Sequence, residues 1–240
     1  MFKKLVPINS STHKDLKLKR APNYNFAKNV HVAPLLAHEF PQASSSFPII
    51  FHKNDETGEY HPLALLGLKK DENLIIQDGR WSATYVPAAI RRYPFAAASV
   101  NGNQENMVVC LDEDAEMFNK DDGEPLFNED GSEGKIIEQV KEFMNSFLER
   151  EASSRSFVKY ISEKELLVPR TVGYTKADGE RVNIGSFFAF DEEKFNQLAD
   201  EDFLEMRKRG YLGVCYAILT SMQQMDTLFR LQQQSTSAAA

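Results

Sequence analysis

The sequence predicts an α+β protein in which a strand-rich N-terminal half packs with a helix-rich C-terminal half as a single unit. Short apolar runs separated by turn residues fill the chain up to Leu111, a pattern typical of strands. From Lys135 onward, apolar residues recur at steps of three and four, which is the spacing of a helix. Both patterns leave apolar surfaces that need a partner, so one unit is favoured over two separate domains.

Composition and charge narrow the class of protein. Of the 240 residues, 42% are hydrophobic and 26% are charged, as in ordinary soluble globular proteins. The net charge of −7 argues against nucleic-acid binding, which requires clustered basic surface. No apolar stretch approaches the roughly 18 residues of a membrane span, and the N-terminus lacks the apolar core of a secretory signal. These observations predict a cytoplasmic protein without a transmembrane segment.

The chain is predicted to consist of an N-terminal arm, one domain and a short tail. Residues 1–29 are basic and polar, with Asp15 as their only acid, and are expected to form a partly extended arm or an electrostatic handle for an acidic partner. Residues 30–232 form the α+β domain, and residues 233–240 a flexible tail. The domain is predicted to contain two subregions, 30–111 and 134–232. The acidic connector 112–133 joins them.

Hairpins are predicted in both halves of the chain. The runs Phe47–His52 and Tyr60–Leu68 flank the turn sequence NDETGE. Residues 96–100 and 107–111 flank Asn101-Gly102, which is a strong hairpin signal. Two further strands, 170–176 and 181–190, flank Ala-Asp-Gly in the C-terminal half.

An apolar stripe predicts a core-facing helix that begins at Lys135 and includes Leu148. Ser162 and Glu165 form a capping-box pair, which predicts a separate short helix ending at Pro169.

Three more helices are predicted near the C-terminus. Asp191 and Asp200 are favourable N-caps for two short helices, and Gly210 is expected to end the second. The last helix is predicted over 211–231. The first half of this helix is apolar nearly all round, which predicts deep burial.

The stretch Asp78–Phe95, DGRWSATYVPAAIRRYPF, combines large aromatic side chains with cations. Trp81 and Tyr85 offer flat surfaces with a polar edge. Pro87 is suited to open a helical turn, and Pro94 to end it. The prolines fix the backbone on both sides, so these side chains are expected to be pre-organised.

Arg91 and Arg92 are adjacent, about 100° apart on a helix, and therefore cannot both face one site. One is expected to pair with a carboxylate inside the protein, and the other to clamp a carboxylate or phosphate. A structural alternative stays open, in which the arginine is satisfied by Asp78 or by a backbone carbonyl. The candidate ligand- or partner-binding residues are Trp81, Tyr85, Arg91, Arg92, Tyr93 and, as a possible acid nearby, Glu39.

Motifs for catalysis and for metal binding are absent from the sequence. His38-Glu39 is not the HExxH pair of a zinc protease, and the acidic segment 112–133 does not fit the calcium-loop template. No nucleophile elbow, P-loop or dinucleotide fingerprint is present. Cys110 and Cys215 are expected to be small buried hydrophobic residues. The sequence therefore predicts no metal, no cofactor and no catalytic residue.

Five segments of the chain match motifs of a known family: APLLAHEF…FPIIF (Ala33 to Phe51), LALLGL…NLII (Leu63 to Ile76), DGRW…YVPAAIRRYPF (Asp78 to Phe95), GEPLF (Gly123 to Phe127) and GYLGVCYAILTSMQQMDTL (Gly210 to Leu228). On these segments the chain resembles the SapC family of bacterial proteins. The resemblance covers nearly the whole chain, and the pattern W…YVPA…RRYPF is its most specific part.

The resemblance implies an accessory role and carries over no catalytic residue. Family members are often encoded beside outer-membrane nutrient receptors and flavin-dependent halogenase-like proteins. The leading hypothesis is a non-enzymatic accessory or binding protein acting with such a system, with a protein partner or a small anionic or aromatic ligand. One alternative is an enzyme acting on a small anionic or aromatic substrate in a pocket lined by Trp81, Tyr85 and Arg91. Another, implied by the family name, is a component linked to surface-layer export.

Overall fold

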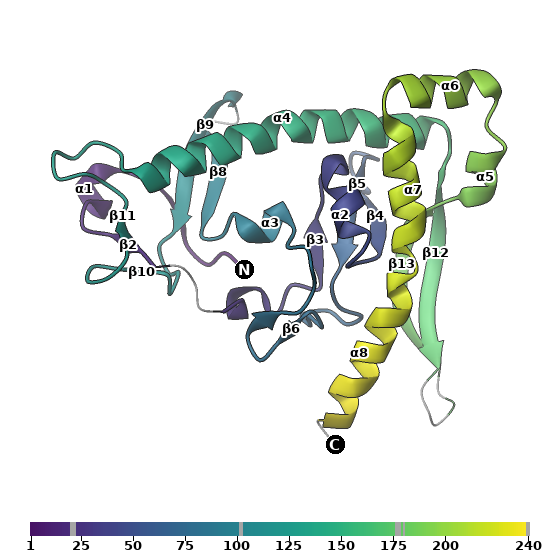
Figure 1. Cartoon of the computed structure of the whole chain (residues 1–240), viewed down its shortest axis with the longest axis horizontal. Coiled ribbons are helices and arrows are strands. Elements are labelled where there is room, and N and C mark those ends of the chain that lie inside the picture. Colours follow the sequence, from purple (N-terminus) through teal and green to yellow (C-terminus); the bar gives the residue numbers. More distant parts are fainter. Residues whose placement is uncertain (20–22, 101–102, 176–178, 180, 239–240) are drawn as a thin grey trace. The chain divides into compact units, whose positions relative to one another are not determined.

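The α+β class is confirmed by the computed structural model, with a strand-rich N-terminal half and a helix-rich C-terminal half (Figure 1). The structure describes residues 1–19, 23–100, 103–175, 179 and 181–238. The chain divides into a first unit, Met1–Tyr24 with Ala89–Glu149, and a second unit, Asn25–Ala88 with Arg150–Ala240. The domain boundaries predicted from composition stay a prediction.

The first unit contains an antiparallel sheet in the order β1-β9-β8. Its strands are β1 (Leu5–Pro7), β8 (Phe95–Val100) and β9 (Asn103–Asp112). The pairing of β8 with β9 confirms the predicted hairpin. The predicted turn at Asn101-Gly102 lies outside the described residues.

A second, smaller sheet of the first unit links the basic N-terminal segment to the acidic segment 112–133. Strand β2 (Lys17–Leu18) pairs with both β10 (Phe118–Asn119) and β11 (Glu124–Pro125), and α1 (Ser10–His13) precedes it. Lys19 and Asp122 form an exposed ion pair at 2.8 Å. The residues buried in the core of this unit are Phe95, Leu111, Leu126, Phe127, Ile136, Ile137 and Met144.

Helix α4 (Lys135–Glu163) confirms the predicted core-facing helix and extends it. The separate short helix predicted from Ser162 to Pro169 is wrong. Apolar spacing continues beyond Leu148, since Phe157 and Ile161 are both buried, so the helix does not stop there. Glu165 then adopts φ 55° and the N–H of Leu166 donates to the Ile161 carbonyl, which ends the helix.

The second unit is built on a five-stranded antiparallel sheet in the order β12-β13-β4-β5-β3. Its strands are β3 (Val32–Pro34), β4 (Ile49–Lys53), β5 (Tyr60–Leu65), β12 (Leu167–Thr175) and β13 (Arg181–Phe190). The pairs β4–β5 and β12–β13 confirm two more predicted hairpins.

Short helices connect this sheet to the C-terminal helices. They are η1 (Asn25–Ala27), η2 (Ala37–Glu39), α2 (Phe40–Ala43), α5 (Glu192–Asn196) and α6 (Asp200–Lys208). Asp191 caps α5 as predicted, because its Oδ1 accepts from the Lys194 N–H at 3.1 Å. For α6 the cap is Ala199, so Asp200 occupies the first turn instead, where a carboxylate still complements the helix dipole. Gly210 follows α6 with φ 73°.

The single terminal helix predicted over 211–231 is wrong, because the chain forms α7 (Tyr211–Ser221) and α8 (Gln224–Ala238). Between them the N–H groups of Met222 and Gln223 donate to carbonyls three residues back, which tightens the chain into a 3₁₀-like turn. Helix α8 extends into the segment predicted to be a flexible tail.

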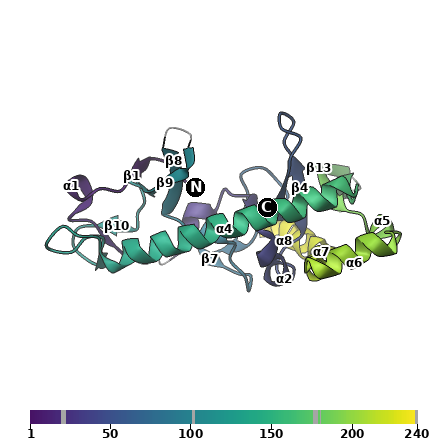
Figure 2. The same ribbon diagram turned by 90° about the horizontal axis from the view of Figure 1, so that it is seen from above.

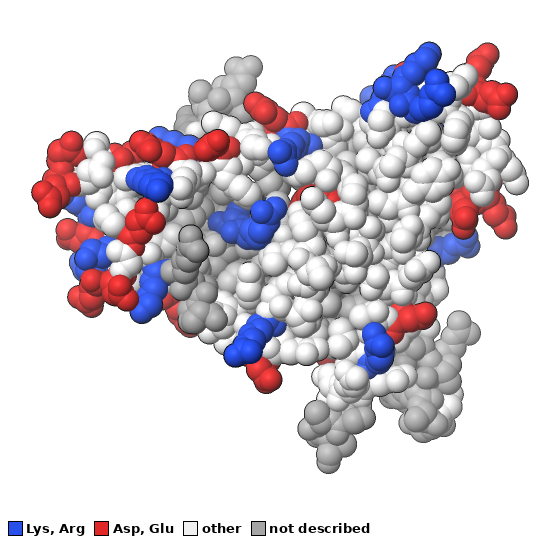
Figure 3. All heavy atoms as spheres, viewed as in Figure 1, with Lys and Arg blue, Asp and Glu red and all other residues white. Residues whose placement is uncertain are grey.

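Helix α7 is buried on one side only, whereas its apolar composition predicts deep burial. It contacts β4, β13, α2 and α6 (Figure 2), and Cys215 and Ile218 are buried there. The Ser221 hydroxyl accepts from the Ile49 N–H at 3.0 Å, which ties the helix to β4. On the other side Tyr216 is 51% exposed. The surface over α7 shows few charged side chains (Figure 3).

Candidate functional site

The stretch Asp78–Phe95, called the signature segment from here on, contains a tight hairpin turn followed by a single helical turn. Strands β6 (Ile76–Gln77) and β7 (Arg80–Trp81) pair across Asp78 and Gly79, which have φ 50° and 75°. Positive φ at both central residues is the geometry of a two-residue hairpin turn. Helix α3 (Ala88–Arg91) follows Pro87.

Glu39 is a fully buried carboxylate that accepts three hydrogen bonds. Its Oε2 accepts from the Leu36 N–H at 2.8 Å, as the glutamate of a capping box does. Its Oε1 accepts from the Tyr85 hydroxyl at 2.6 Å and from the Ala88 N–H at 2.8 Å. The carboxylate therefore fixes the second half of the signature segment to the start of η2.

The indole of Trp81 closes the loop that leads to Tyr85. Its Nε1–H donates to the Tyr85 carbonyl at 2.7 Å, and its ring packs edge-on against Phe47 with centroids 5.9 Å apart. Both Trp81 and Tyr85 are half-buried. The two aromatic side chains are thus held in place by contacts within the second unit.

Asp112 is the corresponding buried carboxylate of the first unit, with no exposed surface. It accepts from the N–H of Lys3 at 3.0 Å and from the N–H of Lys4 at 2.8 Å. The Tyr93 hydroxyl donates to the same carboxylate at 3.3 Å. Each tyrosine of the signature therefore binds a buried carboxylate, Tyr85 in the second unit and Tyr93 in the first.

Burial and the neighbouring Asp112 raise the pKa of Tyr93 to about 12. An unfolded tyrosine loses its proton near pH 10. Between these values the unfolded state releases a proton that the folded state keeps. The stabilising effect of Tyr93 is therefore complete below pH 10 and is lost as the pH rises toward 12.

We expect Tyr93→Phe to reduce the loss of stability between pH 9 and pH 12. The difference in the free energy of unfolding between wild type and variant should change by about 1–2 kcal/mol over this range, since one unit of pKa shift corresponds to about 1.4 kcal/mol. Urea denaturation at several pH values measures it. Burial also raises the pKa of Cys215 to about 12, but that contribution is common to both proteins and cancels. The expectation would be contradicted if the free energy of unfolding changed with pH in the same way in wild type and Tyr93→Phe.

The two arginines contact aromatic rings of the first unit. The Arg92 guanidinium lies 5.6 Å from the ring centre of Phe2 and 5.7 Å from that of Phe147, and Arg92 is half-buried. Arg91 is exposed, with its guanidinium 6.0 Å from the ring centre of Phe143. Such cation–aromatic contacts are worth about 0.5–2 kcal/mol, more where they are desolvated. Arg92 is the more buried of the two, and Arg91 is exposed. The pairing of one of them with an internal carboxylate stays a prediction.

The candidate residues fall into two groups. Glu39, Trp81 and Tyr85 are brought together in the second unit by direct hydrogen bonds. The second group, in the first unit, consists of Arg91, Arg92 and Tyr93. Asp112 was missed, because sequence reasoning assigned it to an exposed acidic connector. The available signal was its position directly after the apolar strand run that ends at Leu111.

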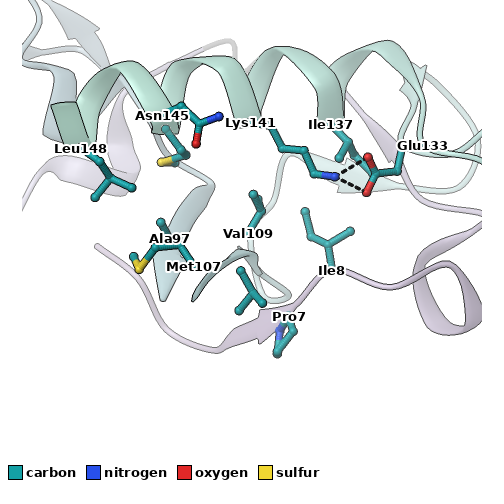
Figure 4. A pocket seen from close by; sticks show the side chains of 12 residues that line it. Pro7, Ile8, Ala97, Met107, Val109, Glu133, Ile137, Lys141, Asn145 and Leu148 are labelled. Carbon is teal, nitrogen blue, oxygen red and sulfur yellow. Dashed lines mark hydrogen bonds and ion pairs between the residues drawn. The ribbon is translucent and has the colours of Figure 1, made fainter. Parts of the chain in front are cut away.

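A separate pocket of about 360 Å³ lies in the first unit between α4 and the sheet β1-β9-β8 (Figure 4). The described residues that line the sheet side are apolar and include Ile8, Ala97 and Val109. On the helix side Lys141 donates to both carboxylate oxygens of Glu133, at 2.6 Å to Oε1. The pocket thus combines apolar walls with one charged pair.

Within the part of the chain that the structure describes, no three His, Cys, Asp or Glu residues gather in a way that could hold a metal ion. No helix of that part is long and apolar enough to cross a membrane.

The fold and the signature segment define an α+β protein whose two units each contain a buried carboxylate bound to a tyrosine of that segment. The model of the SapC family matches residues 8–228. The chain therefore belongs to the SapC family. Comparison with curated proteins and with solved structures gave no match.

Proposed function

We propose that the chain is a non-enzymatic accessory protein that binds an acidic segment of a protein partner through Arg91. The observation that carries the proposal is that Arg91 is an exposed residue whose guanidinium lies over the Phe143 ring, at the end of a helical turn that buried residues hold in position. A guanidinium beside an aromatic ring suits carboxylates and aromatic groups, and arginine is enriched among the residues that dominate interface energies. Trp81 and Tyr85 are candidates for a further contact with the partner.

The hydrogen bonding of the two buried carboxylates favours binding over catalysis. Glu39 and Asp112 each accept three hydrogen bonds from the protein, two of them from backbone N–H groups. A general base must instead reach a proton of the substrate. The enzyme alternative would need another acid or base.

The family resemblance suggests which partners to look for. An outer-membrane nutrient-uptake component or a flavin-dependent halogenase-like protein would fit the accessory role. A component of surface-layer export would be recovered with the membrane or the cell surface, so recovery in the cytosolic fraction alone would contradict that alternative.

We expect Arg91→Ala to reduce capture of the partner at least fivefold while lowering the melting temperature by no more than about 4 °C, because an exposed cation–aromatic contact is worth about 0.5–1 kcal/mol. The experiment is affinity capture by the tagged full chain from cells that naturally produce it, read by quantitative mass spectrometry. Lys135→Ala is the matched control, because it removes another exposed cation of the first unit. Equal recovery with wild type and Arg91→Ala would overturn the proposal.

A further inference from the structure

The pocket between α4 and the sheet β1-β9-β8 has two chemically different sides. In the part of the lining that the structure describes, the strand residues and Ile8 supply apolar side chains, whereas the polar groups come from α4 and from Glu133 just before it. Figure 4 shows the Lys141–Glu133 pair near Ile8 and Ile137, and Leu148 toward the opposite end with Met107 and Ala97. A volume of about 360 Å³ lies at the lower end of the range for small-molecule sites.

Two hydrogen-bond donors of α4 lie one turn apart on the wall of this pocket. Lys141 and Asn145 are four residues apart and therefore share a helix face. The Asn145 side chain makes no hydrogen bond to any residue that the structure describes. One ammonium and one amide donor at this spacing suit the two oxygens of a single carboxylate. Among the described residues of the lining, Glu133 is the only carboxylate, and it lies at one end of the pocket.

The ion pair at the pocket is easily opened. The side chains of Lys141 and Glu133 are 48% and 45% exposed, and such exposed pairs contribute little to stability. The flexible stem of Lys141 allows its ammonium group to leave Glu133 and follow an incoming anion. A ligand carboxylate would therefore compete with Glu133 at small cost.

We propose that this pocket binds a monocarboxylate with an unbranched apolar tail, whose carboxylate contacts Lys141 and Asn145 and whose tail lies on the sheet toward Leu148. The site does not include Arg91, so it stands or falls independently of the partner-binding proposal.

The test compares octanoate, octanol and octylammonium, which share one tail and differ in charge, by titration calorimetry with the full chain. Octanoate is expected to bind at least tenfold more tightly than octylammonium. Lys141→Met should weaken octanoate binding at least tenfold and leave octanol binding within twofold. Glu133→Gln removes the competing carboxylate and should strengthen octanoate binding several-fold. Controls Lys135→Met and Glu138→Gln remove exposed charges of α4 outside the pocket and should change neither.

The location of the probe is checked with methyl-labelled methionine by NMR. Met107 and Met144 line the pocket, so their methyl signals should shift with octanoate while those of the other methionines stay in place. Tighter binding of octylammonium, an unchanged affinity in Lys141→Met, or shifts confined to other methionines would each overturn the proposal. Absence of octanoate binding at millimolar concentration would overturn it as well.

Discussion

Replacing Glu39 with alanine is expected to lower the free energy of unfolding by about 3–5 kcal/mol. The carboxylate is fully buried, and its removal strands the N–H groups of Leu36 and Ala88 together with the Tyr85 hydroxyl. Each buried donor that loses its acceptor costs about 1–3 kcal/mol, and hydrogen bonds to charged groups are at the upper end. The three losses are not additive, because the loop can relax toward water.

A graded series separates the role of the carboxylate from that of the tyrosine. Tyr85→Phe removes one donor and leaves both backbone bonds, so we expect a loss of about 1.5–3 kcal/mol. Glu56→Ala removes an exposed carboxylate of the same unit and should cost less than about 0.5 kcal/mol. Urea denaturation gives the free energies, and amide hydrogen exchange at Leu36 and Ala88 locates the effect.

If Glu39→Ala costs no more than Glu56→Ala, Glu39 does not hold the signature segment. If hydrogen exchange accelerates throughout the second unit and not first at the Leu36 and Ala88 amides, the effect of the variant is not local to the hydrogen bonds of Glu39.

The elements that could be predicted from the sequence are those with local causes. The hairpins at β4–β5 and β12–β13 follow from alternating runs beside turn residues, and α4 follows from a repeat of three and four residues. The C-terminal end of α4 could not be predicted, because Ser162 and Glu165 also fit the pattern of a helix start. The buried spacing of Phe157 and Ile161, which decides the matter, lies upstream of that pair.

The roles of the signature residues could not be predicted, because they depend on contacts between distant parts of the chain. Tyr85 and Glu39 are 46 positions apart, and Asp112 is 109 positions from Lys3. Nothing in the local pattern pairs Tyr85 with Glu39 rather than with a ligand. The sequence did indicate that the arginines diverge, and in the structure they contact different rings, Phe143 for Arg91 and Phe2 and Phe147 for Arg92.

The exposed side of α7 could not be predicted from the sequence for a related reason. Composition shows that Tyr211–Ser221 carries no charge, but not how many elements surround it. An apolar helix covered on one side alone leaves Tyr216 exposed, and such surfaces on soluble proteins often mark interaction sites. The accessory role proposed for the chain is consistent with a surface of this kind.

The second large effect is expected at Asp112, where alanine should lower the free energy of unfolding by about 2–4 kcal/mol. Two backbone amides at 2.8 and 3.0 Å lose their acceptor, whereas the Tyr93 hydroxyl, at 3.3 Å, loses a weaker bond. Because Leu5 pairs with Asp112 in the sheet, release of Lys3 and Lys4 should loosen β1 at that end.

Three variants test whether the Asp112 carboxylate holds the N-terminus. Asp112→Asn keeps the shape but offers one acceptor for two amides, so its cost should fall between wild type and alanine. Asp114→Ala removes an exposed neighbouring carboxylate and should cost under about 0.5 kcal/mol. Hydrogen exchange should accelerate first at Lys3, Lys4 and the amides of β1. Unchanged protection there in Asp112→Ala, together with a large loss of stability, would show that Asp112 stabilises the unit by some other route than the N-terminal amides.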